Sequence, residues 1–259
     1  MIKIEMSIKS LTLLRPVRVS VFLPYGFTSC PTPYRTVWLL HAAMSDGGMF
    51  VEYAPLLDFA NKEGYALIAP SLGNGYYADT GYERQASFLM DELLPIMRQT
   101  ISLSHNREDN TVLGVSMGGY GAVRWAMDAP ETFRAVAAIS GWFGMPCPVD
   151  ERIKKDRELR PIYQIFVKEV MPKLLMDKSG NLHPQADILK LMGKKEPSVP
   201  FPRIGLFCGE NDYLSLGQNK MFFESCEDCG VPAELFLTHG SHNADYWNPA
   251  MLRAVQWLG

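Results

Sequence analysis

A serine flanked by glycines is the residue of this chain with the clearest chemical potential. Ser116 stands at the centre of the pentapeptide Gly114-Val115-Ser116-Met117-Gly118. Apolar and β-branched residues typical of a buried strand precede it, and helical spacing follows it as far as Ala129-Pro130. A serine at a sharp strand-to-helix turn holds its hydroxyl clear of the sheet, and such a turn requires small neighbours. We therefore expect Ser116 to be a nucleophile, although a glycine-rich turn whose serine merely caps the next helix would give the same short motif.

A nucleophilic serine needs a general base, and the base needs a carboxylate that orients it. Two carboxylates, Glu210 and Asp212, follow a late predicted strand, and two histidines, His239 and His242, follow the last one. Asp212 is favoured because the loop can fold back at that position, and His242 because Gly240-Ser241 frees the turn before it. The resulting order of serine, acid and histidine is that of hydrolases built on such a sheet. The other histidines are expected to be scaffold or exposed residues: His41, His105 and His183.

Acyl transfer to a serine also needs N–H donors for the oxyanion that forms on the attacked carbonyl. One donor is expected to be the backbone N–H of Met117, directly after the nucleophile. The other should come from the loop 41–48, which follows the third predicted strand, and we assign it to the N–H of Ala43.

Short apolar strands alternate with helical segments along the chain. Strands are expected over 2–13, 17–23, 37–40, 65–69, 111–113, 135–139, 204–207 and 233–237. Helices are expected over 49–63, 85–101 with an irregularity near Pro95, 120–128, 216–229 and from about 244. This alternation predicts an α/β fold with a mostly parallel central sheet and helices on both faces. The 259 residues, 47% of them hydrophobic, fit one domain that spans 1–259.

The region of about 142–202 departs from this rhythm, since it is charged, punctuated by prolines and without a strong strand. Helix-like pieces occur around 151–158, 162–171 and 185–192. We expect this insertion to form a small helical cap above the carboxyl ends of the strands.

Aromatic and apolar side chains near the expected site are candidates for the substrate pocket. They are Tyr76, Tyr77, Trp142 and Phe143, with Ile162 and Phe166 from the cap. Their rings could hold a sugar or a phenolic group, but isolated aromatic residues also serve to pack the core or the rim of a site.

Composition narrows the partners and the compartment. The formal net charge of -3 and the lack of a basic run argue against a nucleic-acid partner and favour a neutral or weakly charged small molecule. No apolar stretch approaches a membrane span, and the first ten residues have the pattern of an amphipathic strand, so we expect a cytoplasmic protein without a membrane partner. The five cysteines imply no disulfide framework. Cys226 and Cys229 form a C-x-x-C without a second pair, and we expect two free thiols on a helix and no metal site.

Five segments of the chain, in this order, resemble the esterase D family of α/β-hydrolases. The segments are LLHAAMSDGGMF, GYYADTGYERQASFLMDELLPIMR, NTVLGVSMGGYGAVRWAMDAPETFRAVAAISG, CGENDYL and GSHNADYWNPAM. The resemblance spans nearly the whole chain, and SMGGYGA is its strongest motif. It is greatest to the bacterial tributyrin esterases, which are related to S-formylglutathione hydrolases and to feruloyl or acetylxylan esterases.

The resemblance implies the α/β-hydrolase fold, with Ser116, Asp212 and His242 as the catalytic triad and the N–H groups of Ala43 and Met117 as the oxyanion hole. It implies a serine carboxylesterase that hydrolyses short-chain acyl esters of small molecules through an acyl-enzyme intermediate. That chemistry needs no metal and no organic cofactor.

One departure and several rival activities accompany this hypothesis. The family usually has His-Gly after the third strand, whereas this chain has His41-Ala42, and an alanine restricts the loop that carries the oxyanion donor. The rivals are a thioesterase of the S-formylglutathione hydrolase type, an acetyl or feruloyl esterase on carbohydrate esters, an acyltransferase and, least favoured, a non-catalytic binding module. The pair of amino-terminal strands offers an exposed edge through which a homo-oligomer could form.

Overall fold

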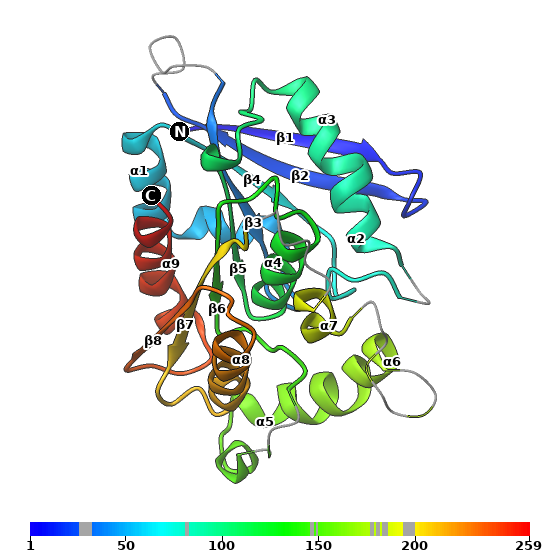
Figure 1. Cartoon of the computed structure of the whole chain (residues 1–259), viewed down its shortest axis with the longest axis vertical. Coiled ribbons are helices and arrows are strands. Elements are labelled where there is room, and N and C mark those ends of the chain that lie inside the picture. The colour runs from blue at the N-terminus through cyan, green and yellow to red at the C-terminus, as the bar shows by residue number, and fades with distance from the viewer. Residues whose placement is uncertain are drawn as a thin grey trace.

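A single sheet forms the centre of the protein in the computed structural model, which describes residues 1–25, 33–80, 83–145, 148, 150–176, 179, 182, 186–193 and 200–259 (Figure 1). The strands of the described residues are β1 (Ile2–Lys9), β2 (Pro16–Leu23), β3 (Arg35–Leu40), β4 (Tyr65–Pro70), β5 (Asn110–Val115), β6 (Ala135–Ile139), β7 (Arg203–Gly209) and β8 (Ala233–Thr238). They lie in the order β1-β2-β4-β3-β5-β6-β7-β8. Strand β2 is antiparallel to both of its neighbours, and the other pairs are parallel.

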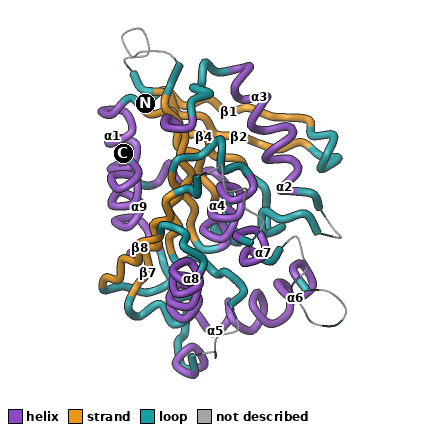
Figure 2. The backbone as a smooth tube through the Cα atoms, in the orientation of Figure 1, coloured by secondary structure: helices purple, strands orange, loops and turns teal. Residues whose placement is uncertain are grey.

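Helices connect the strands and cover the sheet on both faces (Figure 2). The α-helices of the described residues are α1 (Ala54–Glu63), α2 (Gln85–Ser87), α3 (Leu94–Thr100), α4 (Met117–Asp128), α5 (Leu159–Ile162), α6 (Met171–Leu175), α7 (Ile188–Met192), α8 (Leu216–Asp228) and α9 (Ala244–Leu258). Short 3₁₀ turns are η1 (Gly47–Glu52), η3 (Arg107–Asp109) and η4 (Glu151–Lys154), and wider π-helical turns are η2 (Phe88–Leu93) and η5 (Tyr163–Val170).

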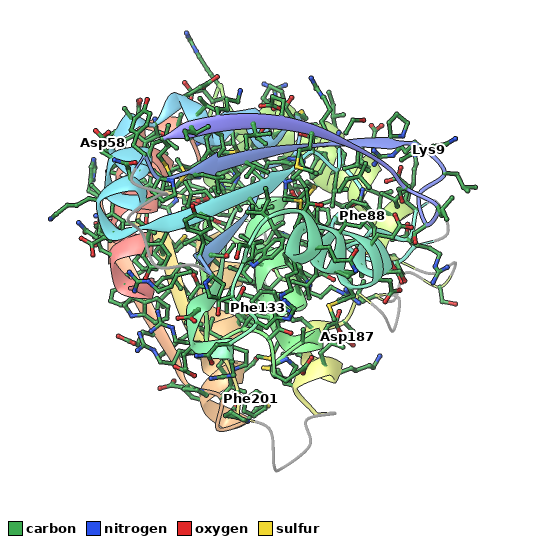
Figure 3. All side chains as sticks on the ribbon, turned by 90° about the horizontal axis from the view of Figure 1, so that it is seen from above. Lys9, Asp58, Phe88, Phe133, Asp187 and Phe201 are labelled. Atoms are coloured by element: carbon green, nitrogen blue, oxygen red, sulfur yellow. The ribbon has the colours of Figure 1, made fainter. Side chains whose placement is uncertain are left out.

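The side chains of β3 explain why both faces of the sheet need helices. Successive residues of a strand point to opposite faces. Val37 and Leu39 belong to the hydrophobic core beneath α1 and α9, whereas Trp38 and Leu40 belong to the core beneath η2, α3, α4 and α8. All four are fully buried, as expected for a parallel sheet with two covered faces. Figure 3 accordingly has Asp58 of α1 and Phe88 of η2 on opposite sides of the molecule.

The first strand is shorter than predicted. We expected it over 2–13, but β1 ends at Lys9 because Ser10 begins a tight turn. The Ser10 hydroxyl accepts the N–H of Leu13 (2.9 Å), the Ser10 N–H donates to the carbonyl of Arg15 (3.1 Å), and Leu14 adopts a left-handed backbone with φ of 53°. The apolar residues of the turn have the sequence pattern of a strand, which is why the prediction extended β1 too far.

Each of the two long helices that the periodicity predicts departs from regular geometry close to a proline. The helix expected over 49–63 becomes η1 and α1, which separate at Tyr53 (φ -108°, ψ 86°), with a proline in the first turn of α1. The helix expected over 85–101 is helical from α2 to α3, and its π-helical turn η2 ends just before the turn that contains Pro95. The predicted irregularity near Pro95 is thus confirmed, since proline lacks the N–H of a regular turn.

The cap region lies between β6 and β7. Its described residues contain one continuous helical stretch, 159–175, which joins α5, η5 and α6 and is called the cap helix below. The predicted helix over 151–158 is only the 3₁₀ turn η4, and the predicted helix over 185–192 appears as α7, with Gln185 outside the described residues. None of the helices in the described part of the chain is long and apolar enough to span a membrane.

Candidate active site

The turn at Ser116 is as sharp as the sequence predicted. Ser116 has φ of 53° and ψ of -114°, a conformation that costs a non-glycine residue free energy. Its N–H donates to the carbonyl of Ile139 (2.7 Å), and α4 begins at the next residue. A Cβ at Gly114 would collide with the Gly118 carbonyl, and a Cβ at Gly118 with the Leu40 carbonyl. Both glycines are therefore required for the close approach of α4 to the sheet.

Three polar side chains meet at the carboxyl edge of the sheet. Ser116 follows β5, Asp212 follows β7 and His242 follows β8, and these parallel strands end at the same edge. The Ser116 Oγ lies 2.9 Å from His242 Nε2, and His242 Nδ1 lies 2.9 Å from Asp212 Oδ2. The structure therefore joins the serine, histidine and aspartate of the sequence prediction in one hydrogen-bonded chain.

The carboxylate of Asp212 is held by Ser215, which the sequence analysis did not single out. The Ser215 N–H donates to Oδ1 (2.9 Å) and the Ser215 hydroxyl donates to Oδ2 (2.6 Å). Burial would raise the pKa of Asp212, but the facing imidazole of His242 and the hydrogen bonds from His242 and Ser215 lower it below its ordinary value. A carboxylate only accepts, so His242 Nδ1 carries the proton and Nε2 is free to accept from Ser116. The signal for Ser215 was its position three residues after Asp212, directly before a predicted helix.

Backbone hydrogen bonds between two loops explain why Asp212 and His242 meet. The Asn211 N–H donates to the carbonyl of Gly240 (2.9 Å), which ties the loop after β7 to the loop after β8. Their alternatives point elsewhere, since Glu210 is exposed and the exposed His239 faces the Asn211 side chain (3.4 Å).

The buried imidazole of His41 fixes the loop after β3. The Leu72 N–H donates to His41 Nε2 (3.0 Å), so Nδ1 carries the proton and donates to the carbonyl of Ala42 (2.8 Å). Burial lowers the pKa of His41 and outweighs its backbone hydrogen bond and the nearby Asp46, which favours this neutral form. In a trans peptide the N–H points opposite to the carbonyl, so the Ala43 N–H is directed away from His41.

The alanine at position 42 fits this loop without a left-handed backbone. Within the described part of the chain, Ala42 is not one of the non-glycine residues with positive φ. Its side chain is buried in the core beneath α1 and α9. The loop therefore does not need the glycine that the family pattern has there.

A second loop supports the first through two tyrosines in left-handed conformations. Tyr76 and Tyr77 have φ of 61° and 53°, and both are buried. The buried Gln85 side chain accepts the Tyr77 N–H (2.9 Å) and donates to the carbonyl of Leu72 (2.6 Å). The Tyr77 hydroxyl donates to the carbonyl of His41 (3.0 Å). Gln85, another residue that the sequence analysis missed, thus ties the strained loop to the His41 loop.

A small cavity of about 50 Å³ lies against Ser116 and His242. Its other walls are Ala42, Ala43, Met44, Tyr76, Trp142, Ile162, Phe166, Val167, Met171, Leu214 and Trp247. They come from the loops after β3, β4, β6 and β7, from the cap helix and from α9. Trp247, whose ring meets the His242 ring edge to face at 5.0 Å, was not predicted to lie there.

The predicted pocket residues fall into two groups. Tyr76 and Trp142 line the cavity, together with Ile162 and Phe166 of the cap helix. Tyr77 and Phe143 lie in the core instead: the Tyr77 ring packs on His41 with the ring centroids 5.7 Å apart, and Phe143 stacks on Phe222 at 4.2 Å.

Metal ligands do not gather in the described residues, since no group of three or more histidine, cysteine, aspartate or glutamate side chains could hold an ion there. Cys226 is buried and Cys229 exposed, and both are free thiols. His105 is exposed, whereas His183, Cys30 and Cys147 lie outside the described residues.

Comparisons with known proteins point to esterases. A family model described as "Putative esterase" matches residues 10–258. An acetyl esterase of Caldicellulosiruptor saccharolyticus is 23% identical over 233 residues, which cover 86% of this chain and 83% of that protein. The fluorophosphonate-binding serine hydrolase F of Staphylococcus aureus superimposes with a TM-score of 0.79 at 24% identity, over 99% of this chain and 98% of that one. The S-formylglutathione hydrolase of the same organism gives 0.74 at 24%, over 99% and 98%.

These similarities confirm the predicted α/β-hydrolase fold, and they support the broader relationship to esterases. The nearer relationship to tributyrin esterases stays a prediction.

The close approach at Gly118 predicts a loss of stability on Gly118→Ala. The added methyl group must displace the Leu40 carbonyl, so we expect the free energy of unfolding in urea to fall by about 1–3 kcal/mol. Gly193→Ala is the matched control, because Gly193 has φ of -71° and its Cβ would meet nothing closer than 3.9 Å. The control should be neutral or stabilising by about 0.4–1 kcal/mol. Equal stabilities of the two variants would contradict the packing described for the turn.

The neutral, buried His41 predicts a stability that depends on pH. Its folded pKa lies below the ordinary 6.5, so its contribution is complete above about pH 6.5 and is lost as the pH falls through the folded pKa. Between these values the unfolded chain binds a proton that the folded chain does not. Urea unfolding between about pH 8 and pH 5 should therefore show a smaller decrease for His41→Gln than for the parent. The same decrease in both proteins would show that the pKa of His41 is not lower in the folded protein than in the unfolded chain.

Proposed function

Since the chain belongs to the esterase family whose model matches residues 10–258, we propose that it is a serine carboxylesterase that hydrolyses short-chain acyl esters through Ser116, His242 and Asp212. The observation that carries this proposal is the hydrogen-bonded chain of the three side chains, with 2.9 Å at each contact to the imidazole. Each side chain follows a different strand of a rigid sheet, so their geometry does not depend on one mobile loop.

In this mechanism the Ser116 oxygen attacks the ester carbonyl while His242 Nε2 takes the hydroxyl proton. Asp212 keeps the imidazole in the required tautomer and stabilises the imidazolium. The tetrahedral intermediate collapses when His242 returns the proton to the departing alcohol, which leaves an acyl group on Ser116. Water, activated by the same imidazole, then releases the acid and restores the serine.

Two backbone N–H groups are proposed to bind the oxyanion. The N–H of Met117 belongs to the first residue of α4, where the helix dipole favours negative charge. The N–H of Ala43 is the second donor. The hydrogen bond from His41 Nδ1 to the Ala42 carbonyl supports its orientation away from the histidine. Both donors belong to segments adjoining the Ser116 cavity, and neither requires a particular side chain.

The size of the cavity supports a short acyl group. A cavity of about 50 Å³ has room for only a few water-sized spheres at roughly 10–15 Å³ each, so a short acyl group such as formyl or acetyl fits better than a long chain. The walls are mostly apolar, as suits a methyl group. That one relative is named an acetyl esterase agrees with this choice.

Substitution of two of the three proposed catalytic residues tests the mechanism. We expect Ser116→Ala to lower kcat for p-nitrophenyl acetate on the order of 10⁶-fold and Asp212→Asn by about 10⁴-fold, because the first removes the nucleophile and the second reverses the histidine tautomer. Circular dichroism of each variant checks that the fold is retained.

The discarded alternatives provide matched controls for these variants. Glu210→Gln and His239→Gln change the same residue types in the same two loops, but both side chains are exposed. Each should keep kcat/KM within about twofold of the parent, as is usual for surface substitutions. If Glu210→Gln or His239→Gln abolished activity while the buried residues proved dispensable, the proposed triad would be wrong.

The small cavity also predicts a preference among acyl chains. In a series of p-nitrophenyl esters from acetyl to octanoyl, kcat/KM should be greatest for acetyl and about tenfold lower or more by hexanoyl, because the extra methylene groups have no room. The leaving group is constant, so the ratio reports the acyl side alone. A maximum at octanoyl would contradict an acyl site of this size.

A thioesterase of the S-formylglutathione hydrolase type is a second candidate, favoured by the similarity to a solved enzyme of that name and by a cavity that fits a formyl group. The same triad would attack the thioester carbonyl. Comparison of kcat/KM for S-formylglutathione with that for p-nitrophenyl acetate separates the two activities, since only the second candidate requires the thioester to be strongly preferred.

A further inference from the structure

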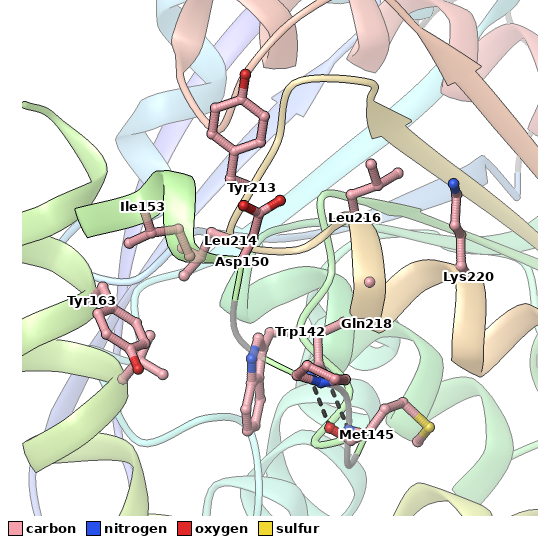
Figure 4. A pocket seen from close by; sticks show the side chains of 13 residues that line it. Trp142, Met145, Asp150, Ile153, Tyr163, Tyr213, Leu214, Leu216, Gln218 and Lys220 are labelled. Carbon is pink, nitrogen blue, oxygen red and sulfur yellow. Dashed lines mark hydrogen bonds between the residues drawn. The ribbon is translucent and has the colours of Figure 1, made fainter. Parts of the chain in front are cut away.

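A second and larger cavity, of about 390 Å³, adjoins the cavity at Ser116 (Figure 4). The two share the walls Trp142, Val167 and Leu214, so they lie side by side. We propose that the larger cavity binds the alcohol portion of the ester, and that this portion is an alcohol carrying a ring. The inference rests on the proposed esterase function and specifies its substrate.

The position of the larger cavity relative to the proposed catalytic residues assigns it to the alcohol. Its walls include Tyr213 and Leu214, which directly follow Asp212, and it shares Leu214 with the small cavity, which His242 lines. Ala43, which carries the proposed oxyanion donor, and Tyr76 line the small cavity but not the larger one. The imidazole must give its proton to the departing oxygen, and therefore the alcohol lies on the side of His242.

Size supports the same assignment. A volume of about 390 Å³ falls in the range of roughly 300–1,000 Å³ that is usual for small-molecule sites, whereas about 50 Å³ holds only a short acyl group. An ester with its large half on the acyl side fits this pair of cavities poorly. The volumes thus select esters of a small acid and a large alcohol.

The walls of the larger cavity are suited to a ring. Trp142, Tyr163 and Tyr213 line it, and the guanidinium of Arg152 stacks over the Tyr213 ring at 4.0 Å from its centroid, which fixes that ring. Flat aromatic walls pack favourably on the faces of another ring. Figure 4 shows Tyr163 on the cap helix across the open space from Trp142.

Polar groups occur at the border of this cavity. Lys220 offers an ammonium group, so a polar substituent at the edge of the ring would find a partner there. The carboxylate of Asp150 already accepts hydrogen bonds from Arg152, at 2.6 Å from Nη2 to Oδ2. Gln218 is not available for this purpose, because its amide already accepts the N–H of Met145 (2.8 Å) and donates to the Met145 carbonyl (2.9 Å). The occupant is therefore a ring with apolar faces and a tolerance for polar groups at its edge.

A pair of isomeric esters tests the assignment directly. Benzyl acetate carries its ring on the alcohol and methyl phenylacetate carries it on the acid, and both release simple primary alcohols. We expect kcat/KM to be at least about tenfold greater for benzyl acetate. Equal values, or a preference for methyl phenylacetate, would overturn the assignment. Ethyl acetate reports the esterase activity itself: if it is not hydrolysed, the proposed function fails, and if it is hydrolysed without the isomer preference, only the present inference fails.

A cavity-filling variant provides the second test. Lys220 is exposed on α8 and lines only the larger cavity, so Lys220→Trp should block the ring site without disturbing Ser116. We expect kcat/KM for benzyl acetate to fall at least about tenfold and that for ethyl acetate to stay within about twofold. The control Glu224→Trp places the same bulk at an exposed position of α8 that lines neither cavity, and it should leave both rates within about twofold. An equal loss on both esters, or no loss on benzyl acetate, would contradict the proposal.

Discussion

The left-handed backbone of Ser116 is the constraint around which the candidate site is organised. Such a conformation costs a serine on the order of 1–3 kcal/mol, and it persists only where the surrounding packing enforces it. Here the enforcement comes from β5, whose residues are all buried, and from α4, which lies close enough to the sheet to exclude a side chain at Gly118. A relaxed turn would withdraw the hydroxyl from His242. Glycine weakens a helix, but at Gly118 it allows α4 to approach the sheet. The buried strand and this glycine therefore both hold the turn at Ser116 in place.

The loops around Ser116 are held by buried polar groups that are each satisfied by a specific partner. The carboxylate of Asp212 receives hydrogen bonds from Ser215 and His242, and the imidazole of His41 both accepts from and donates to backbone groups. Inside a protein such bonds are stronger than at the surface, and a missing partner is correspondingly costly. The same hydrogen bonds therefore fix the protonation states and the positions of the loops. The rigidity of the loops and the tautomers of the two histidines therefore both result from these buried hydrogen bonds.

The sequence predicted the parts of this site that depend on local chain geometry. Ser116 was found because a sharp turn needs small residues on both sides, and Asp212 and His242 because each follows a strand of a parallel sheet. Ser215 and Gln85 were missed, since their roles depend on which loop folds against which. The aromatic residues divided for the same reason: neighbours such as Trp142 and Phe143 point into the cavity and into the core respectively. Adjacent positions in a loop have no fixed periodicity from which that difference could be read.

The cap helix, which lies in the region with the least regular sequence pattern, contributes side chains to both cavities. Val167 lies in the wall of both cavities, while Ile162 and Phe166 close the smaller one and Tyr163 faces the larger. One helix therefore sets both the space for the acid and the space for the alcohol. None of its residues takes part in the hydrogen bonds that join Ser116, His242 and Asp212, so they can change without removing those bonds. The fold thereby separates the proposed catalytic residues, which lie at the strand ends, from the walls of the two cavities, to which the cap helix and the loops contribute.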